Sequence, residues 1–387
     1  MIYKKRIMAL ILNSLFSRMT LSLLPVLVFL VLPQVKHFAG LHHSTHAVYL
    51  ILLSFIISFI LMPIVIAIGH VLNIVDKPDA VRKDHKHPTP LTGGLAIYAA
   101  FALTIVFNFD FSMSMKGILV AGTLIFATGI IDDWTDLPAW FRLLVQIIAA
   151  GILIACGVRI TFIPDWLGGF YVETILTVLW LVGITNSMNF IDGMDGLASG
   201  TSIIYAFFFG IIAWTTNQYY MMYLSITIAG SCAGFFPYNF QHDKPAAVFL
   251  GDSGATFLGF MMASFAILGE WGKDMLDIAI PVLIMSVLIF DMSLTTLVRI
   301  RTGEVKSFGE WLRYTGRDHF HHRLTALGLN QKQAALIFFT VSICFGIESV
   351  TMLFANFANS VLVLIHTALV FILLGYILVR RNNIDKK

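Results

Sequence analysis

The sequence has little charge and little cysteine. Only 12% of its 387 residues are Asp, Glu, Lys or Arg, whereas 58% are hydrophobic and the mean hydropathy is +0.84. This composition excludes an ordinary soluble domain of this length. The net charge is only +3, and we expect no nucleic acid among the partners. Cys156, Cys232 and Cys344 lie inside hydrophobic runs without a CxxC pair, so we expect neither a disulfide nor a zinc framework.

Long hydrophobic runs are abundant. A helix crosses a bilayer with about 20 apolar residues and satisfies its own backbone hydrogen bonds. The runs therefore predict an all-α, polytopic membrane bundle with about eleven transmembrane helices. We expect these near residues 47–70, 93–109, 117–131, 139–156, 172–190, 197–214, 219–238, 254–270, 275–299, 334–354 and 360–379.

The chain divides into a transmembrane domain and two flanking pieces. Residues 47–380 form the predicted domain, and residues 381–387 a cytoplasmic tail. The N-terminal extension, residues 1–46, holds one more hydrophobic segment at about 19–35. That segment is either a signal anchor or an additional span, because no small-residue cleavage site follows it.

Positive charges are distributed unevenly between the two predicted membrane faces. With the N-terminus and the loop 71–92 on the cytoplasmic side, 20 of the 25 Lys and Arg residues lie on that side and four on the other. Because such residues accumulate in cytoplasmic loops, this orientation is favoured. Every polar motif described below then falls on the cytoplasmic face.

Two acidic motifs stand at predicted membrane boundaries. Asp132 and Asp133 end one span within the motif DDxxD. Adjacent carboxylates repel one another, so they indicate a bound cation or a base with a shifted pKa, unless they only cap the helix end. Asp252, within Gly-Asp-Ser-Gly, begins another span. It is either an N-cap or a ligand for a hard cation such as Mg²⁺.

A third polar stretch, residues 186–197, places Asn189, Asp192 and Asp195 at three-residue intervals. On a helix these side chains share one face. In a non-helical segment, the glycines after the two aspartates would let a ligand approach the backbone. Carboxylates beside hydrocarbon are costly, so we favour an ion, a substrate or a proton over a plain polar loop.

A basic loop near the C-terminal spans contains three histidines followed by Arg323. Without cysteine or HExxH spacing, this loop does not predict zinc. It suits a diphosphate, whose oxygens accept charge-assisted hydrogen bonds, and the alternative is a solvated loop near anionic lipid. Asp291, about two turns inside the ninth span, either faces the same cavity or is hydrogen-bonded within the bundle.

The proline-punctuated loop 76–94 is also basic and ends in Gly93 and Gly94. We expect these glycines to open the next helix near a phosphate or a lipid headgroup. Carboxylates for a metal and a basic loop for a diphosphate together favour phosphoryl transfer, in which a protein mainly positions groups and stabilises charge.

Five motifs in this order resemble those of the polyprenyl-phosphate N-acetylhexosamine-1-phosphate transferases. They match residues 76–94, 132–136, 189–197, 251–254 and 319–323, and the resemblance covers about residues 47–380. The family consists of membrane enzymes that transfer a sugar-1-phosphate from a UDP-sugar to a lipid phosphate and release UMP. The HxHHR loop resembles the undecaprenyl-phosphate GlcNAc-1-phosphate branch. The HHxxE-like loop of the phospho-MurNAc-pentapeptide translocases is missing.

The resemblance implies roles for the acidic motifs. Asp132 and Asp133 would lie at the reaction centre, where one of them acts as base for the lipid phosphate or helps to bind it. Asp252 would be the principal Mg²⁺ ligand with Asn189 as its neighbour, and Mn²⁺ is expected to substitute. The nucleotide pocket would include Asp192 and Asp195, the latter being the better candidate for uracil.

The resemblance also implies the basic contacts. The diphosphate and sugar would be held by His319, His321, His322 and Arg323. The family often carries a basic residue soon after DDxxD, and here the first is Arg142. The candidate contacts of the lipid phosphate are Arg142, Lys83 and His85.

The expected reaction is Mg²⁺-dependent transfer of GlcNAc-1-phosphate from UDP-GlcNAc to undecaprenyl phosphate, the first membrane step of a surface polysaccharide pathway. We expect a multi-pass protein of the bacterial inner membrane with a cytoplasmic active site, and we leave a homodimer open. The alternatives are another UDP-N-acetylhexosamine, an aromatic prenyltransferase and an ion-coupled transporter. The prenyltransferase leaves the histidine loop unexplained, and transporters usually place their charges near the midplane.

Overall fold

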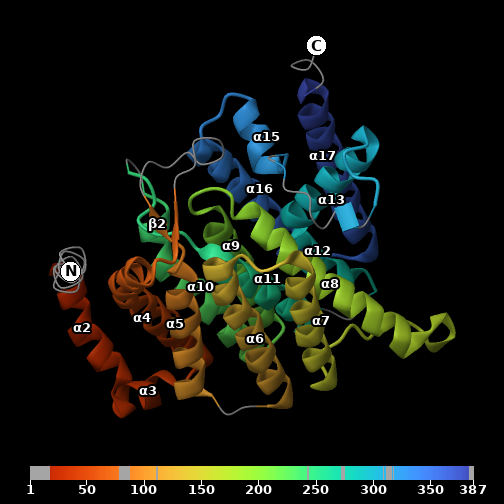
Figure 1. Cartoon of the computed structure of the whole chain (residues 1–387). Helices are drawn as coiled ribbons and strands as arrows, with labels where there is room; N and C mark the ends of the chain where they lie inside the picture. Colours follow the sequence, from red (N-terminus) through yellow and green to blue (C-terminus); the bar gives the residue numbers. More distant parts are fainter. Residues whose placement is uncertain are drawn as a thin grey trace.

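The described chain is almost entirely helical (Figure 1). The computed structural model describes residues 18–77, 88–109, 112–241, 244–271, 275–307, 309–310, 316 and 318–382. Its longer helices are α2 (Arg18–Val31), α4 (His43–Leu72), α5 (Gly93–Asn108), α6 (Met113–Thr135), α7 (Ala139–Ala155), α8 (Gly169–Ile191), α9 (Leu197–Thr215), α10 (Tyr219–Asn239), α11 (Gly251–Leu268), α13 (Ser286–Thr302), α16 (Gln331–Met352) and α17 (Phe357–Asn382). The short elements are α3 (Pro33–Ala39), α12 (Ala279–Ile284), α15 (Phe320–Ala326), and the 3-10 turns Asp165–Leu167 and Met275–Ile278.

The helices confirm an all-α, polytopic membrane protein. Each of the eleven predicted spans coincides with a helix or a bent helix pair. By length and hydropathy, seven described helices are able to cross a membrane, or up to nine if the bent pairs α2–α3 and α12–α13 each form one span. The apolar helices α5 and α7 are shorter than the other spans. The number of crossings therefore stays a prediction.

Two predicted segments are broken rather than straight. The N-terminal run bends by 70° between α2 and α3. Leu32, which precedes a proline, adopts extended backbone angles of −60° and 134°, because the proline ring disfavours helix at the preceding residue. Pro33 then starts α3, where its missing N–H costs nothing. The segment predicted at 275–299 bends by 80° at Met285 between α12 and α13.

Helix α11 lies in the middle of the bundle (Figure 1), and almost all of its side chains are buried. Glycines bring its neighbours close. A Cβ atom at Gly129 of α6 would lie 2.3 Å from the Ser253 Cα atom, and one at Gly94 of α5 would lie 2.5 Å from the Gly254 Cα atom. Such close helix contacts need residues without side chains. They hold the first turn of α11 against the ends of α5 and α6.

The loop before α5 contains a short two-stranded ladder and is joined to the start of α11 by backbone hydrogen bonds. Strand β1 (Val75–Asp76) pairs antiparallel with β2 (Thr89–Pro90). The N–H groups of Gly93 and Gly94 then donate to the carbonyl oxygens of Phe249 and Leu250, at 3.0 and 2.9 Å. Both glycine N–H groups are therefore occupied. The helix start expected at Gly93 is confirmed, and both glycines fasten α5 to α11. Their nearness to a phosphate or headgroup stays a prediction.

Candidate active site

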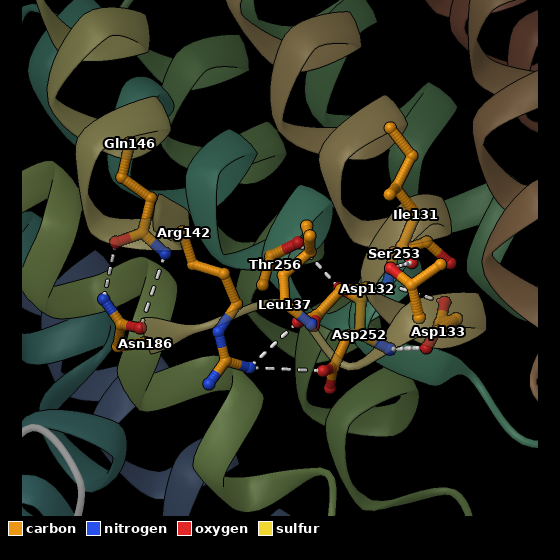
Figure 2. A network of polar contacts seen from close by, with 11 residues as sticks. Ile131, Asp132, Asp133, Leu137, Arg142, Gln146, Asn186, Asp252, Ser253 and Thr256 are labelled. Atoms are coloured by element: carbon orange, nitrogen blue, oxygen red, sulfur yellow. Dashed lines mark hydrogen bonds and ion pairs between the residues drawn. The ribbon is translucent and has the colours of Figure 1, made fainter. Parts of the chain in front are cut away.

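Asp132, Arg142 and Asp252 form a charged cluster where α6, α7 and α11 meet (Figure 2). Arg142 Nη1 donates to Asp132 Oδ2 at 2.9 Å and to Asp252 Oδ2 at 3.4 Å. The other Asp132 oxygen accepts the Leu137 N–H at 2.7 Å. Asp132 is only 5% exposed, whereas the Asp252 side chain is 37% exposed. Arg142, ten residues beyond Asp132, thus pairs with Asp132 and Asp252 but not with Asp133.

Asp133 points the other way and caps α11 (Figure 2). Its Oδ1 accepts the N–H of Asp252 at 2.7 Å, and its Oδ2 accepts the N–H of Ser253 at 3.1 Å. The first N–H groups of a helix have no intrahelical partner and attract a carboxylate. Gly251 permits this approach, with φ of +75° and no Cβ to meet the Asp133 carboxylate. Of the two adjacent acids, Asp133 therefore positions the residue that follows the glycine.

The end of α8 reaches the same cluster. Asn189, in the last turn of the helix, lines one small cavity together with Asp132 and Arg142. Asp192 follows as the C-cap, and its N–H donates to the Asn189 carbonyl oxygen at 3.2 Å. Burial, together with the charges of Asp252, Asp133 and Asp195, raises the pKa of Asp192 well above its usual value. A carboxylate so crowded by others calls for a cation beside it.

Asp195 belongs to a neighbouring turn rather than to the charged cluster. Its Oδ2 accepts the N–H of Ala246 at 3.2 Å. Gly196 follows with φ of +75°, and its N–H donates to Asn239 Oδ1 at 2.6 Å. The Asn239 amide also donates to the carbonyl oxygen of Val248 at 2.9 Å. Asn239 thus ties the 189–197 stretch to the segment that leads into α11.

The histidine loop is held by Asp291 and Arg299 of α13. Asp291 is 2% exposed, its Oδ2 lies 3.0 Å from His319 Nδ1, and its Oδ1 accepts the Phe320 N–H. Arg299 donates two hydrogen bonds, of 2.7 and 2.6 Å, to the Asp318 carboxylate. Asp291 is thus hydrogen-bonded, and its partners belong to the histidine loop; whether it also faces the substrate cavity stays a prediction. His319 is a positioning residue on this geometry.

Charge balance in the loop agrees with this arrangement. Burial acts to raise the pKa of Asp318, but Arg299, His319 and Arg323 outweigh it and hold the pKa below its usual value. The Arg323 Nε donates to the Asp318 carbonyl oxygen at 2.6 Å, while its Nη1 is buried without a hydrogen-bond partner. Arg323 therefore bonds the loop backbone through Nε and keeps donor capacity at Nη1.

His321 is the buried histidine that lacks a partner. It is 0% exposed, and neither ring nitrogen has a hydrogen-bond partner. Burial, followed by the neighbouring His322, lowers its pKa to about 3, so the imidazole is neutral at ordinary pH. A Cβ atom at Gly193 would lie 3.0 Å from His321 Nε2 and 3.5 Å from His322 Nε2. The loop therefore meets the 189–197 stretch at Gly193, where a ligand would satisfy the orphaned nitrogens.

The donor set fits a hard cation. Asp132, Asp252 and Asp192 with Asn189 offer only oxygen donors, in keeping with Mg²⁺. Among the described residues, no three His, Cys, Asp or Glu side chains are gathered as a ready-made metal site. That is compatible with Mg²⁺, which commonly uses one or two carboxylates together with water and substrate phosphates. Asp252, the more exposed of the two acids that pair with Arg142, is the better placed of the two to hold it.

The predicted residues thus gather from four distant stretches of chain. Asp132, Arg142, Asn189, Asp192 and Asp252 meet in one cluster, and the histidine loop adjoins it at Gly193. Lys83 and His85 lie outside the described residues. Reasoning from the sequence missed Asn239, Arg299 and Asp318, which bond the motif residues, and Gln146, which hydrogen-bonds Asn186. A polar residue inside an otherwise apolar run, as at Gln146, was the available signal.

Comparison with known proteins supports the motif assignment. The pattern described as glycosyl transferase family 4 matches residues 115–270. A Bacillus subtilis (strain 168) protein named "probable undecaprenyl-phosphate N-acetylglucosaminyl 1-phosphate transferase" is 32% identical over 313 residues, which cover 78% of this chain and 85% of that protein. A decaprenyl-phosphate N-acetylglucosaminephosphotransferase of Mycolicibacterium smegmatis is 33% identical over 296 residues, 67% of this chain and 70% of its own.

A third relative is named for a different sugar. The phospho-N-acetylmuramoyl-pentapeptide-transferase of Lactiplantibacillus plantarum is 28% identical over 326 residues, 77% of this chain and 95% of its own. Similarity of this extent decides against the aromatic prenyltransferase and the transporter. The chain belongs to glycosyl transferase family 4 and is a multi-pass membrane enzyme that transfers a sugar phosphate.

Proposed function

We propose that this enzyme transfers GlcNAc-1-phosphate from UDP-GlcNAc to undecaprenyl phosphate in a Mg²⁺-dependent reaction and releases UMP. The two relatives named for GlcNAc phosphate transfer are 32% and 33% identical to the chain, and the muramoyl-pentapeptide relative is 28% identical. The distribution of Lys and Arg favours an active site that faces the cytoplasm, where nucleotide sugars are made.

The observation that carries the proposal is the contact between the acidic cluster and the histidine loop. A Cβ atom built on Gly193 would lie 3.0 Å from His321 Nε2, so the loop contacts the chain beside the half-buried Asp192. One side of this meeting point offers carboxylates for a cation, and the other offers imidazole and guanidinium donors. A diphosphate needs both, because its charge must be neutralised while its oxygens accept hydrogen bonds.

The chain's own residues divide the work of phosphoryl transfer. Bound Mg²⁺ would neutralise the diphosphate and the leaving oxygen. Asp252 and Asn189 bind on the cation side, and His321 and Arg323 donate toward the sugar diphosphate. Asp132 is the candidate base, since its partner Arg142 is a side chain that is able to turn to an incoming lipid phosphate. Asp133 is less suited, because both its oxygens are bound to backbone N–H groups.

The bond changes follow from this arrangement. An oxygen of the lipid phosphate forms a bond to the sugar-linked phosphorus of UDP-GlcNAc. The bond from that phosphorus to the bridging oxygen breaks, and its electron pair leaves with UMP. A proton still on the lipid phosphate passes to Asp132. An attack by an aspartate before the lipid is the alternative order of events.

The proposal is tested with purified protein, undecaprenyl phosphate and UDP-GlcNAc labelled in the sugar. We expect label in the lipid fraction, an equal amount of UMP, no transfer in EDTA, and recovery with Mg²⁺ or Mn²⁺. Parallel reactions with UDP-GalNAc and UDP-MurNAc-pentapeptide test the donor. Transfer from one of those and none from UDP-GlcNAc would overturn the sugar assignment. Label bound to protein before lipid is added would reveal an aspartyl intermediate.

A further inference from the structure

Gln146 of α7 and Asn186 of α8 form a hydrogen-bonded amide pair beside the charged cluster (Figure 2). The Asn186 Nδ2 donates to Gln146 Oε1 at 2.7 Å and to the Val182 carbonyl oxygen at 2.8 Å. The Gln146 Nε2 donates back to Asn186 Oδ1 at 3.4 Å. Gln146 is 5% exposed, and it sits in an apolar helix. Two facing hydrogen bonds therefore join helices whose contact residues are 40 positions apart in sequence.

Each member of the pair lies one helical turn from a residue of the cluster. Gln146 follows Arg142 by four positions on α7, and Asn186 precedes Asn189 by three on α8. At these spacings side chains lie on the same helix face. All four line one cavity of about 20 Å³ together with Asp132. That volume admits about one water molecule, and the polar lining offers it partners.

We propose that Gln146 and Asn186 are positioning residues, which set the rotation of α7 against α8 and so hold Arg142 on Asp132 and Asp252. This inference rests on the proposed function, because it concerns the placement of Arg142 for the transfer reaction. Neither amide is among the residues that contact the acids.

The physical reason is that apolar packing by itself specifies the rotation of two membrane helices poorly. Apolar side chains pack in several rotations at similar cost, and lipid does not favour one of them. A two-way amide contact is satisfied in one register only. Arg142 reaches two carboxylates with a single nitrogen, at 2.9 and 3.4 Å, so a small rotation of α7 breaks the longer contact first. Displacement by about 1 Å is enough to lower a rate by about 100-fold.

The test is a double-mutant cycle measured in full-length protein. Gln146→Leu is expected to lower kcat by about 10- to 100-fold, as loss of supporting contacts does in other sites, with the KM for UDP-GlcNAc within about twofold. In an Arg142→Gln background the same change is expected to cost less than about threefold, because the residue that it positions is already lost. A merely structural amide would lower kcat by the same factor in both backgrounds.

The swapped variant Q146N/N186Q keeps one long and one short amide, and recovery of at least part of the activity is expected. Thr123→Val is the matched control, because it removes another interhelical hydrogen bond, the 2.8 Å contact between Tyr98 and Thr123. It should leave kcat unchanged. Equal losses in both backgrounds, or wild-type activity of Gln146→Leu, would overturn the inference. If the wild-type protein transfers no GlcNAc-1-phosphate, the proposed function fails instead, and the two failures are distinguishable.

Discussion

Replacing Asp133 with asparagine tests whether this acid positions Asp252 or carries the proton. The carboxylate accepts two N–H groups at the start of α11, from Asp252 at 2.7 Å and Ser253 at 3.1 Å. Asparagine has one acceptor oxygen and an NH₂ group, so one backbone N–H would face another donor. The first turn of α11, with Asp252 in it, is then held less firmly.

The expected loss of kcat follows from two free-energy costs. Leaving a buried donor unsatisfied costs about 1–3 kcal/mol, and removing a negative charge from a helix N-terminus costs about 0.3–1 kcal/mol. If this whole free energy is lost from the placement of Asp252 in the transition state, kcat falls by about 10- to 1,000-fold, since 1.36 kcal/mol is tenfold in rate. If Asp133 only positions Asp252, the remaining activity of the variant keeps the wild-type pH profile.

The assay is labelled-lipid formation as a function of pH, with thermal unfolding measured on the same samples. The matched control is Asp136→Asn in the same motif. Asp136 is exposed and adopts a left-handed conformation with φ of 54°, which asparagine tolerates equally well. We expect near wild-type kcat for this control. A residual Asp133→Asn activity that has lost its acidic pH limb would show that Asp133 is the base, and unchanged kcat would refute its role altogether.

Three further predictions concern the histidine loop and the metal ligand. His321→Leu should lower transfer by at least about tenfold without lowering the unfolding temperature, because both imidazole nitrogens are buried without partners; a marked loss of stability would contradict this. Asp252→Asn should raise the Mg²⁺ concentration for half-maximal activity by at least about tenfold, and an unchanged Mg²⁺ titration would remove this ligand assignment. The Asp318 pKa is lowered in the folded state, so its stabilisation is present above the usual value of 3.8 and disappears as pH falls through the folded pKa. The difference in unfolding temperature between wild type and Asp318→Asn should therefore shrink below pH 4, and a difference constant from pH 3 to 6 would contradict the pairing with Arg299.

The acidic motifs show how much of the site could be predicted from the sequence. Asp132 and Asp133 are adjacent and alike in sequence, and the same role was expected of either. In the structure, one pairs with Arg142 and the other caps α11. Neighbouring residues on a helix point about 100° apart, so only the positions of α7 and α11 decide which acid meets which partner. The same holds for Asp291, whose histidine partner lies 28 residues later.

Hydropathy, charge asymmetry and motif order by themselves determined the membrane class, the predicted cytoplasmic face and the family. These are local properties, because a bilayer demands about 20 apolar residues per span whatever the neighbouring helices do. The tertiary structure alone decided that Gly93 and Gly94 fasten two helices, that His321 lacks a partner, and that the amides on α7 and α8 join. Such contacts depend on how each helix is rotated and on approach distances set to within a few tenths of an ångström. The spacing of residues along the sequence does not specify either quantity.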